Sequence, residues 1–116
     1  MGGRVSAGAI EAIDRILNRG GDADDVLRAV VVVLVEQGGC DWAGILFSEE
    51  GELVLGPYAG MPEPGARTQV PVVFQGTRVA ELVADGCDDV AFLERVAVLV
   101  SAHCLVGWDT GGVSWE

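Results

Sequence analysis

Positive charge is scarce in this chain of 116 residues. Lysine is absent, the 7 basic residues are all arginines, and 18 acidic residues bring the formal net charge to −11. Binding to the phosphate backbone of a nucleic acid requires clustered cations. The composition therefore excludes nucleic acid as a partner and fits an acidic protein surface.

Signals for metal binding and for membranes are also missing. The three cysteines show no C-x-x-C spacing and there is one histidine, so the sequence predicts no zinc site, no disulfide framework and no cofactor. No apolar run approaches the ~20 residues that a membrane span needs. We expect a cytoplasmic protein, and the arginine-only composition, rich in alanine and valine, is typical of bacteria.

The chain is long enough for one domain. Half of its residues are hydrophobic, and a domain of this length buries roughly 65% of the surface of its unfolded chain. We expect a single domain over residues 1–116, with residues 109–116 as an irregular tail. Two tryptophans near the end, Trp108 and Trp115, predict that the tail packs on the body or on another chain.

Two helices are predicted before residue 40. Ser6 is placed to cap the first helix, and Gly20 ends it. Its apolar residues recur at three- and four-residue spacing: Ile10, Ile13 and Leu17. The second helix, Val26–Gln37, has an aspartate-rich start and ends at Gly38. Its valines favour strands, but the caps and a length of about three turns favour a buried helix.

A β-hairpin is predicted in the stretch Asp41–Gly60. Its arms, Trp42–Phe47 and Glu52–Tyr58, are rich in aromatic and branched residues. They flank a polar connector, Ser48–Gly51, whose glycine can take the positive φ that short hairpin loops require.

A second strand pair is predicted after a short loop. The loop, Met61–Arg67, contains prolines and a glycine, which we expect to exclude regular structure. The strands Thr68–Phe74 and Thr77–Ala84 follow, with a turn at Gln75 and Gly76. Their valines leave no polar face, which is typical of central strands.

The last predicted element is a long helix, Val90–Val106. Asp88 or Asp89 is placed to cap it, and a glycine follows it. The helix is apolar on nearly every side, so it offers more apolar surface than contact with one sheet covers.

Short motifs in and after the hairpin resemble those of a known family. They are Trp42–Gly44, Glu52–Tyr58, the pair Gly60-x-Pro62, and Val70–Val72 at the start of the third strand. These motifs resemble GAF domains, and within them the chain is most similar to the branch that reduces free methionine-R-sulfoxide. The similarity covers most of residues 10–106.

The element pattern and the resemblance together predict the fold. Helices segregated from antiparallel strands indicate an α+β class. The resemblance implies a minimal GAF-like domain whose antiparallel sheet has the strand order 2-1-4-3. The two N-terminal helices and the long C-terminal helix are then expected on one face of the sheet.

The chain departs from the reductase branch between its second and third strands. There the resemblance implies a long insert that closes over the substrate and carries the attacking cysteines. Here about ten residues join Gly60 to Val70. Glu63–Gly65 follows the Gly60-x-Pro62 motif without a thiol, so the implied nucleophile is missing.

The implied substrate-binding carboxylates are altered as well. The acidic pair that holds the substrate's ammonium in that branch falls on Val83 and Asp85, so one carboxylate remains. A further acidic position falls on Arg67, which inverts its charge. We therefore expect no catalytic residues and no reduction of free methionine-R-sulfoxide.

The thiols and the histidine offer no replacement. Sulfoxide reduction needs a thiolate near the sulfur and a second thiol to resolve the sulfenic acid. Cys40, Cys87 and Cys104 are favoured as small buried hydrophobes or surface thiols. His103 points about 100° away from Cys104 on a helix and is favoured as a core or interface histidine over a catalytic base.

Four residues are candidates for contact with a small-molecule ligand: Trp42, Tyr58, Glu81 and Asp85. Trp42 and Tyr58 are placed to line a remnant pocket beneath the 61–67 loop, and core packing is the simpler alternative. For Glu81, a solvated face of the sheet is the simpler alternative.

Two classes of function remain open. The first is a non-catalytic, truncated GAF-like module for signalling or association, and the second is a small-molecule sensor with a remnant pocket. A reductase-like enzyme is the third choice.

We expect a homodimer formed chiefly through the Val90–Val106 helix, with help from the two N-terminal helices. One face of that helix carries two adjacent apolar stripes, and contact with the sheet covers one. The residues concerned are Phe92, Leu93, Val96, Val98, Leu99, Val100, His103, Cys104 and Leu105.

Overall fold

A computed structural model describes residues 2–49, 51–87 and 89–105. Asp88 and the predicted tail with Trp108 and Trp115 lie outside the described residues. The elements in chain order are α1 (Gly2–Arg19), α2 (Ala23–Glu36), β1 (Trp42–Glu49), β2 (Glu52–Gly60), the 3₁₀ turn η1 (Pro64–Ala66), β3 (Arg67–Phe74), β4 (Thr77–Asp85) and α3 (Val90–Leu105).

The four strands form one antiparallel sheet in the order β2-β1-β4-β3. The predicted α+β class and strand order are therefore confirmed. The predicted hairpin is also confirmed, since Glu49 pairs with Glu52 and Gly51 has a φ of 84°. The prediction of two central strands in the second pair is wrong for β3, which is an edge strand with Gln69 and Pro71 exposed.

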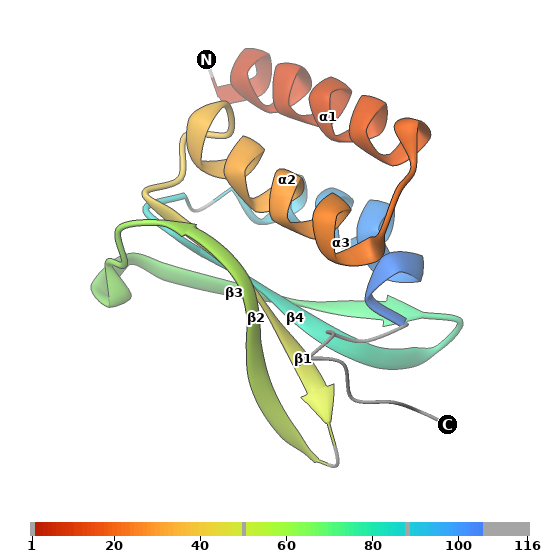
Figure 1. Cartoon of the computed structure of the whole chain (residues 1–116). Coiled ribbons are helices and arrows are strands. Elements are labelled where there is room, and N and C mark those ends of the chain that lie inside the picture. Colours follow the sequence, from red (N-terminus) through yellow and green to blue (C-terminus); the bar gives the residue numbers. More distant parts are fainter. Residues whose placement is uncertain (1, 50, 88, 106–116) are drawn as a thin grey trace.

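The helices form two layers on one face of the sheet (Figure 1). Helix α2 packs on β1 and β2, and α3 packs on β3 and β4. Helix α1 packs on α2 and α3, on their far side from the sheet. The three helices thus lie on the predicted side, but α1 covers the other helices rather than the strands.

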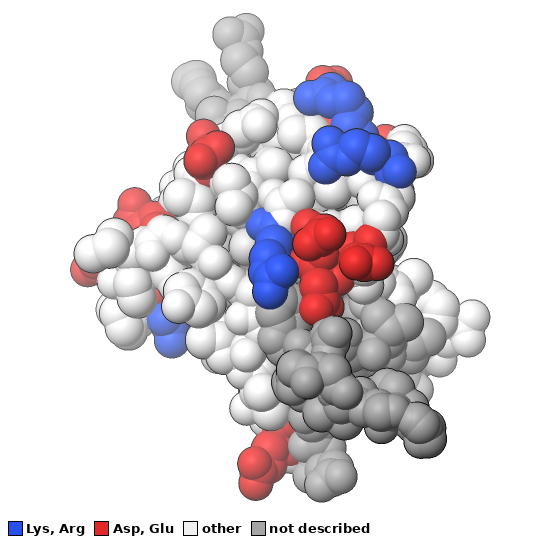
Figure 2. Space-filling view, viewed as in Figure 1, with Lys and Arg blue, Asp and Glu red and all other residues white. Residues whose placement is uncertain are grey.

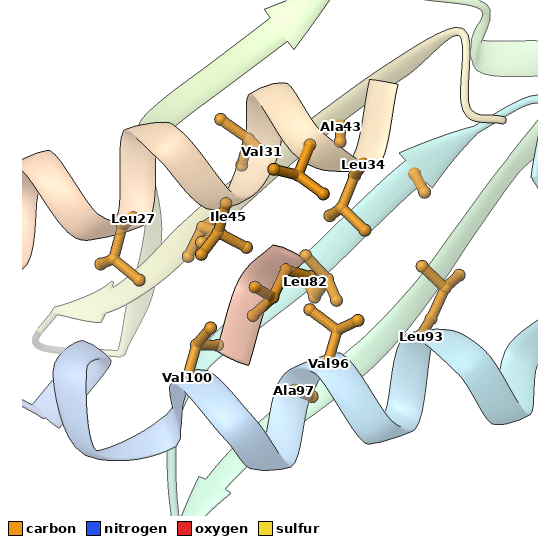
Figure 3. Close-up of a cluster of buried hydrophobic side chains, with 14 of the residues drawn as sticks. Leu27, Val31, Leu34, Ala43, Ile45, Leu82, Leu93, Val96, Ala97 and Val100 are labelled. Carbon is orange, nitrogen blue, oxygen red and sulfur yellow. The ribbon is translucent and has the colours of Figure 1, made fainter. Parts of the chain in front are cut away.

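The core lies between the sheet and the α2/α3 layer (Figure 3). On β1 the side chains alternate, so that Ala43, Ile45 and Phe47 point into the core. Leu34 of α2 and Leu93 of α3 meet them from the helical side and are fully buried. Burying each of these large aliphatic side chains contributes about 1.5–3 kcal/mol.

The second apolar stripe of α3 is mostly covered within this chain. Ile13 and Ile16 of α1 join the core, because α1 packs on α3 as well as on α2. Of the residues expected to leave a stripe uncovered, only Val98 is exposed among the described side chains. The uncovered apolar surface of α3 is therefore narrower than the sequence predicts.

Several element boundaries differ from the predicted ones by a few residues, as for α2, which begins at Ala23 instead of Val26. Helix α1 begins at Gly2, so Ser6 lies inside it and does not cap it; capping preference is a weak guide where a helix continues into earlier residues. The predicted cap of α3 is confirmed for Asp89, whose Oδ1 accepts a hydrogen bond of 3.1 Å from the N–H of Phe92.

The connection from β2 to β3 contains a regular turn, although its prolines and glycine predict irregular structure. Pro64 opens η1, and the N–H of Ala66 donates to the carbonyl of Glu63 at 2.9 Å. Proline suits the first position of a helical turn because its φ is already set and an N–H there has no partner.

Among the described residues, no helix is both long enough and apolar enough to span a bilayer.

Candidate functional site

The face of the sheet turned away from α2 and α3, which we call the outer face, carries all four predicted ligand-contact residues. Trp42 pairs with Asp85, and Tyr58 pairs with Gly44. These residues alternate along the strands with the core residues. Glu81 lies on the same side of β4 as Asp85 but four residues away, which is about 13 Å along a strand. The structure therefore brings Trp42, Tyr58 and Asp85 together and leaves Glu81 apart.

Asp85 is the only buried charged residue among the described ones, and it is 0% exposed. Arg67 of β3 reaches it with two parallel bonds, from Nε to Oδ1 at 2.8 Å and from Nη2 to Oδ2 at 2.9 Å. The backbone N–H of Glu63 adds a third bond to Oδ2, at 2.7 Å. A two-pronged guanidinium–carboxylate pair of this kind is among the strongest side-chain interactions.

The ion pair fixes the charge of both partners. Hydrogen bonding from Arg67 is the main cause that holds the pKa of Asp85 below its ordinary value of 3.8; burial opposes this, and the Glu63 N–H supports it. The same hydrogen bond raises the pKa of Arg67. Both groups are therefore ionised at neutral pH, and their charges cancel.

The β2–β3 connection holds one wall of this site. The N–H of Met61 donates to the carbonyl of Asp41 at 2.9 Å, and the N–H of Gly86 donates to the carbonyl of Ala66 at 2.9 Å. These bonds tie both ends of the connection to the strands. The η1 turn between them aims the Glu63 N–H at the buried carboxylate.

Two aromatic rings extend the site from Arg67 towards β2. The Arg67 Cζ atom lies 5.1 Å from the centroid of the Trp42 ring, within range of a cation–π interaction. The Trp42 ring stacks on that of Tyr58, with centroids 6.1 Å apart and planes inclined at 26°. Trp42 is buried, whereas Tyr58 is 60% exposed.

A glycine makes room for the Trp42 ring. A Cβ atom added at Gly44 would lie 2.5 Å from Cη2 of Trp42. The ring therefore occupies the space that a side chain at position 44 would need. Trp42 is packed between Gly44, Arg67 and Tyr58, which favours the packing interpretation of this residue over that of a pocket wall.

Glu81 takes part in a separate ion pair. Its Oε2 accepts a hydrogen bond of 2.9 Å from Nη1 of Arg78, three residues earlier on β4. The Glu81 side chain lies on the outer face but is only 12% exposed. A neighbouring guanidinium lets a carboxylate lie against the sheet because its charge is partnered.

Cys104 and His103 do not join this site. Cys104 faces the core, and burial raises the pKa of its thiol to about 12, as expected for a small buried hydrophobe. His103 is half-buried, and its Nδ1 atom has no hydrogen-bond partner within the described part of the chain. Residues 2–49, 51–87 and 89–105 contain no group of three or more His, Cys, Asp or Glu that could hold a metal ion.

Sequence reasoning missed the partner of Asp85. In the sequence, Arg67 is notable only because the resemblance implies an acidic residue at its position. In the fold, Arg67 supplies the cation that Asp85 binds. The register of β3 against β4, in which Arg67 opposes Asp85, would have been the signal. In the view of Figure 2 the charged side chains stand in small groups with wide uncharged areas between them, and no broad basic surface is present.

The fold and this site define a class of protein: an α+β domain with helices on one face of a four-stranded antiparallel sheet and a small polar site on the other.

No family model matches the sequence, and no curated protein matches it. Solved structures do match its fold. A GAF sensor protein from Burkholderia vietnamiensis has a TM-score of 0.73 at 17% identity, over 89% of this chain and 95% of that one.

Two further structures agree. The GAF domain of a phosphoenolpyruvate-protein phosphotransferase from Coxiella burnetii has a TM-score of 0.68 at 15% identity, over 84% of this chain and 93% of that one. Free methionine-R-sulfoxide reductase from Neisseria meningitidis, in complex with its substrate, has a TM-score of 0.68 at 18% identity, over 85% and 89%. By fold, the chain is a GAF-like domain.

Proposed function

We propose that this chain is a non-catalytic GAF-like module that works by association. The observation that carries the proposal is the Arg67–Asp85 pair. The carboxylate of Asp85, at the position that the resemblance assigns to the substrate's ammonium, already binds a cation from the same chain. Its hydrogen-bonding capacity is used by Arg67 and by the Glu63 N–H, so the site is satisfied without a ligand.

The energetics of the pair support this interpretation. An ammonium ligand would have to displace a guanidinium that is held by two parallel bonds and by the Trp42 ring. Removing one partner of a buried ion pair is costly because the other charge stays desolvated. A substrate ammonium is one compact cation, so it cannot form the bidentate contact that the planar guanidinium makes with the carboxylate.

The position of the thiols supports it as well. The β2–β3 connection, Met61–Ala66, contains no cysteine, and Cys104 points into the core. Sulfoxide reduction requires a reactive thiolate beside the substrate. None of the described thiols lies on the outer face beside Trp42 and Tyr58.

An activity assay tests the non-catalytic part. Incubation with free methionine-R-sulfoxide and a thioredoxin system should give no turnover above the protein-free control. Turnover that disappears on changing Cys40, Cys87 or Cys104 to serine would overturn the proposal.

For the association, we propose a homodimer through the helical side. Val98 of α3 is 71% exposed, and Val90 and Val32 are the other large apolar side chains of α3 and α2 that are exposed among the described residues. A two-fold pairing is the commonest closed arrangement for such a patch. Because α1 covers most of the α3 stripe, Val98 is expected at the centre of the contact.

Light scattering at tens of micromolar tests the dimer. The wild-type protein should be dimeric, and Val98→Glu should shift it towards a monomer that remains folded. Leu53→Glu, on an exposed residue of β2, is the matched control and should remain dimeric. A monomeric wild-type protein, or loss of the dimer in the Leu53 variant alone, would sink the helical interface.

A sensor is the second candidate, and one observation favours it. The Arg67 side chain is 35% exposed, and the Trp42 ring lies between it and the exposed ring of Tyr58, so a small carboxylate could bind the exposed part of the guanidinium while its apolar part packs along the two rings. A thermal-shift screen of small carboxylates tests this, because a ligand at 100 times its Kd adds about 2.7 kcal/mol of stability. A hit whose shift persists in both Tyr58→Ala and Arg67→Ala would not be bound at this site.

We also place the module in the cytoplasm and assign it no metal or nucleotide cofactor. The three described cysteines are free thiols, and thiols persist best in a reducing compartment. The net charge of −11 repels phosphates. Stoichiometric metal in tag-free protein, or measurable binding of a cyclic nucleotide, would contradict this assignment.

A further inference from the structure

We propose that Cys40 and Cys87 form a reversible disulfide when the protein meets a peroxide, which makes the end of the sheet beside Asp85 a site of redox modification. The inference is independent of the proposed function, since it concerns no ligand and no partner. It rests on the placement of two thiols that are 47 positions apart in the sequence.

The antiparallel pairing of β1 and β4 brings the two cysteines to the same end of the sheet. Cys40 lies two residues before β1 begins, and Cys87 lies two residues after β4 ends. Trp42 opposes Asp85, and the N–H of Asp41 donates to the carbonyl of Asp85 at 2.8 Å. The two segments therefore leave the sheet side by side.

The Cys87 thiol reaches the segment that carries Cys40. Cys87 Sγ contacts the carbonyl of Gly38, two residues before Cys40, and donates to it at 3.9 Å; the Cys87 thiol also lies close enough to raise the pKa of Cys40. The backbone on both sides is held, because the Cys40 N–H donates to the carbonyl of Leu34 at 3.1 Å and the Gly86 N–H donates to that of Ala66. The contact thus belongs to the fixed part of the fold.

The two thiols differ in access to solvent. Cys40 is buried in the core, whereas Cys87 is only partly buried. Burial is the main cause that raises the pKa of the Cys40 thiol, and the neighbouring Cys87 raises it further. Cys87 is therefore the thiol that an oxidant in solution reaches first, and Cys40 is the thiol that resolves its oxidised form.

The reaction proceeds in two balanced steps with hydrogen peroxide as the oxidant. The Cys87 thiolate attacks one peroxide oxygen, so an S–O bond forms, the O–O bond breaks, and the hydroxide released takes up a proton to give water. Cys40 Sγ then attacks the Cys87 sulfenic sulfur. The S–S bond forms, the S–O bond breaks, and the hydroxyl leaves as water with the Cys40 proton.

The disulfide would tie the end of α2 to the start of α3. It closes a loop running from residue 40 to residue 87, and closing a loop of that length restricts the unfolded chain strongly. For a domain of this size the expected rise in Tm is on the order of 10 °C. Because a buried, protonated thiol attacks slowly, the Cys87 sulfenic acid should be long-lived enough to trap.

Mass spectrometry of the full chain tests the proposal. Reduced protein treated with hydrogen peroxide should lose two hydrogen atoms, keep one thiol for alkylation after denaturation, and yield a peptide linking Cys40 to Cys87. Dithiothreitol should reverse both the mass change and the rise in Tm. A dimedone adduct should appear on Cys87 when trapping is done early.

Cysteine variants provide the controls. Cys87→Ser should lose the cross-link and the rise in Tm, and Cys104→Ser should keep both, because Cys104 lies on α3 within the core. The Cys87 variant is the decisive one, since its partly exposed side chain makes a folding defect avoidable. Oxidation of Cys87 to the sulfinic acid with Cys40 still alkylatable, or a disulfide found only between chains, would refute the proposal.

Discussion

At the scale of single residues, the Arg67–Asp85 pair distinguishes this site from a binding site whose carboxylate is free to bind a cationic ligand. A buried carboxylate must be neutralised or partnered, and here the partner is supplied from the neighbouring strand at 2.8 Å and 2.9 Å. The two residues are one unit with Trp42, whose ring lies against the guanidinium. Changes at either residue should therefore be felt in stability.

The first prediction concerns Arg67→Ala. It leaves the carboxylate of Asp85 buried with only the Glu63 N–H as partner, so the Tm should fall by roughly 5–10 °C. Arg78→Ala is the matched control, because it breaks a pair of the same chemistry whose arginine is largely exposed; its Tm should change by about 2 °C or less. Thermal unfolding followed by circular dichroism measures both. An equal fall in Tm for the two variants would contradict the claim that the buried Asp85 depends on its partner more than Glu81 does.

The second prediction is a pH dependence. Because the pKa of Asp85 is lowered in the folded state, its ionised form stabilises the fold. That contribution is full above the ordinary value of 3.8 and is lost as the pH falls through the lower folded pKa.

The difference in Tm between wild type and Arg67→Ala should therefore be constant near neutral pH and shrink below about pH 4. Thermal unfolding of both proteins across acidic buffers measures it, and the subtraction removes the effect of the other carboxylates. A difference that stays unchanged down to about pH 2 would show that Asp85 is not the titrating group.

At the scale of elements, the exit of β2 shows why a glycine is needed at one particular strand end. Gly60 has a φ of 92°, and a Cβ atom there would collide with the carbonyl oxygen of Asp41. The same carbonyl accepts the N–H of Met61. The end of β2 therefore combines a left-handed backbone conformation at Gly60 with a close contact to the backbone just before β1.

The third prediction compares Gly60→Ala with Gly51→Ala. Gly51 in the hairpin connector also has a positive φ, of 84°, but nothing lies within 4 Å of the point where a Cβ atom would stand. Gly51→Ala should cost about 1 kcal/mol, from the left-handed conformation alone. Gly60→Ala should cost roughly 3 kcal/mol, since the contact with Asp41 must open as well. Urea unfolding measures both, and similar costs would mean that the β2 exit relaxes freely.

At the scale of the whole molecule, α1 completes the helical layer. The sheet is covered by α2 and α3, and α1 covers the side of those two helices that faces away from the sheet (Figure 1). Its inward side buries Ala9, Ile13 and Ile16, and its outward residues are exposed. The chain thereby shields most of the surplus apolar surface of α3 by itself.

The fourth prediction follows from this role of α1. Ile13→Ala should destabilise the domain by about 2–4 kcal/mol, because the side chain is fully buried and leaves a cavity between helices. Ile10→Ala on the same helix is the control and should cost clearly less, since Ile10 is only partly buried. Equal small costs, measured by urea unfolding, would show that α1 is not an integral layer.

The sequence by itself determined the local elements of this protein. The hairpin follows from two apolar arms around a glycine that takes a positive φ, and Asp89 caps α3 as its position before an apolar run predicts. The strand order came from the motifs at Trp42–Gly44 and Val70–Val72, through the resemblance that they carry. Periodicity, caps and turns act over a few residues, so they can be read along the chain.

Only the tertiary structure decided which distant residues meet. Arg67 and Asp85 are 18 positions apart, and Cys40 and Cys87 are 47 apart. Their contacts depend on the register of β3 and β1 against β4. A shift of one residue in that register would turn each side chain to the opposite face of the sheet. The site and the thiol pair are therefore properties of the packed sheet, because burial against the helices fixes the register that local patterns leave open.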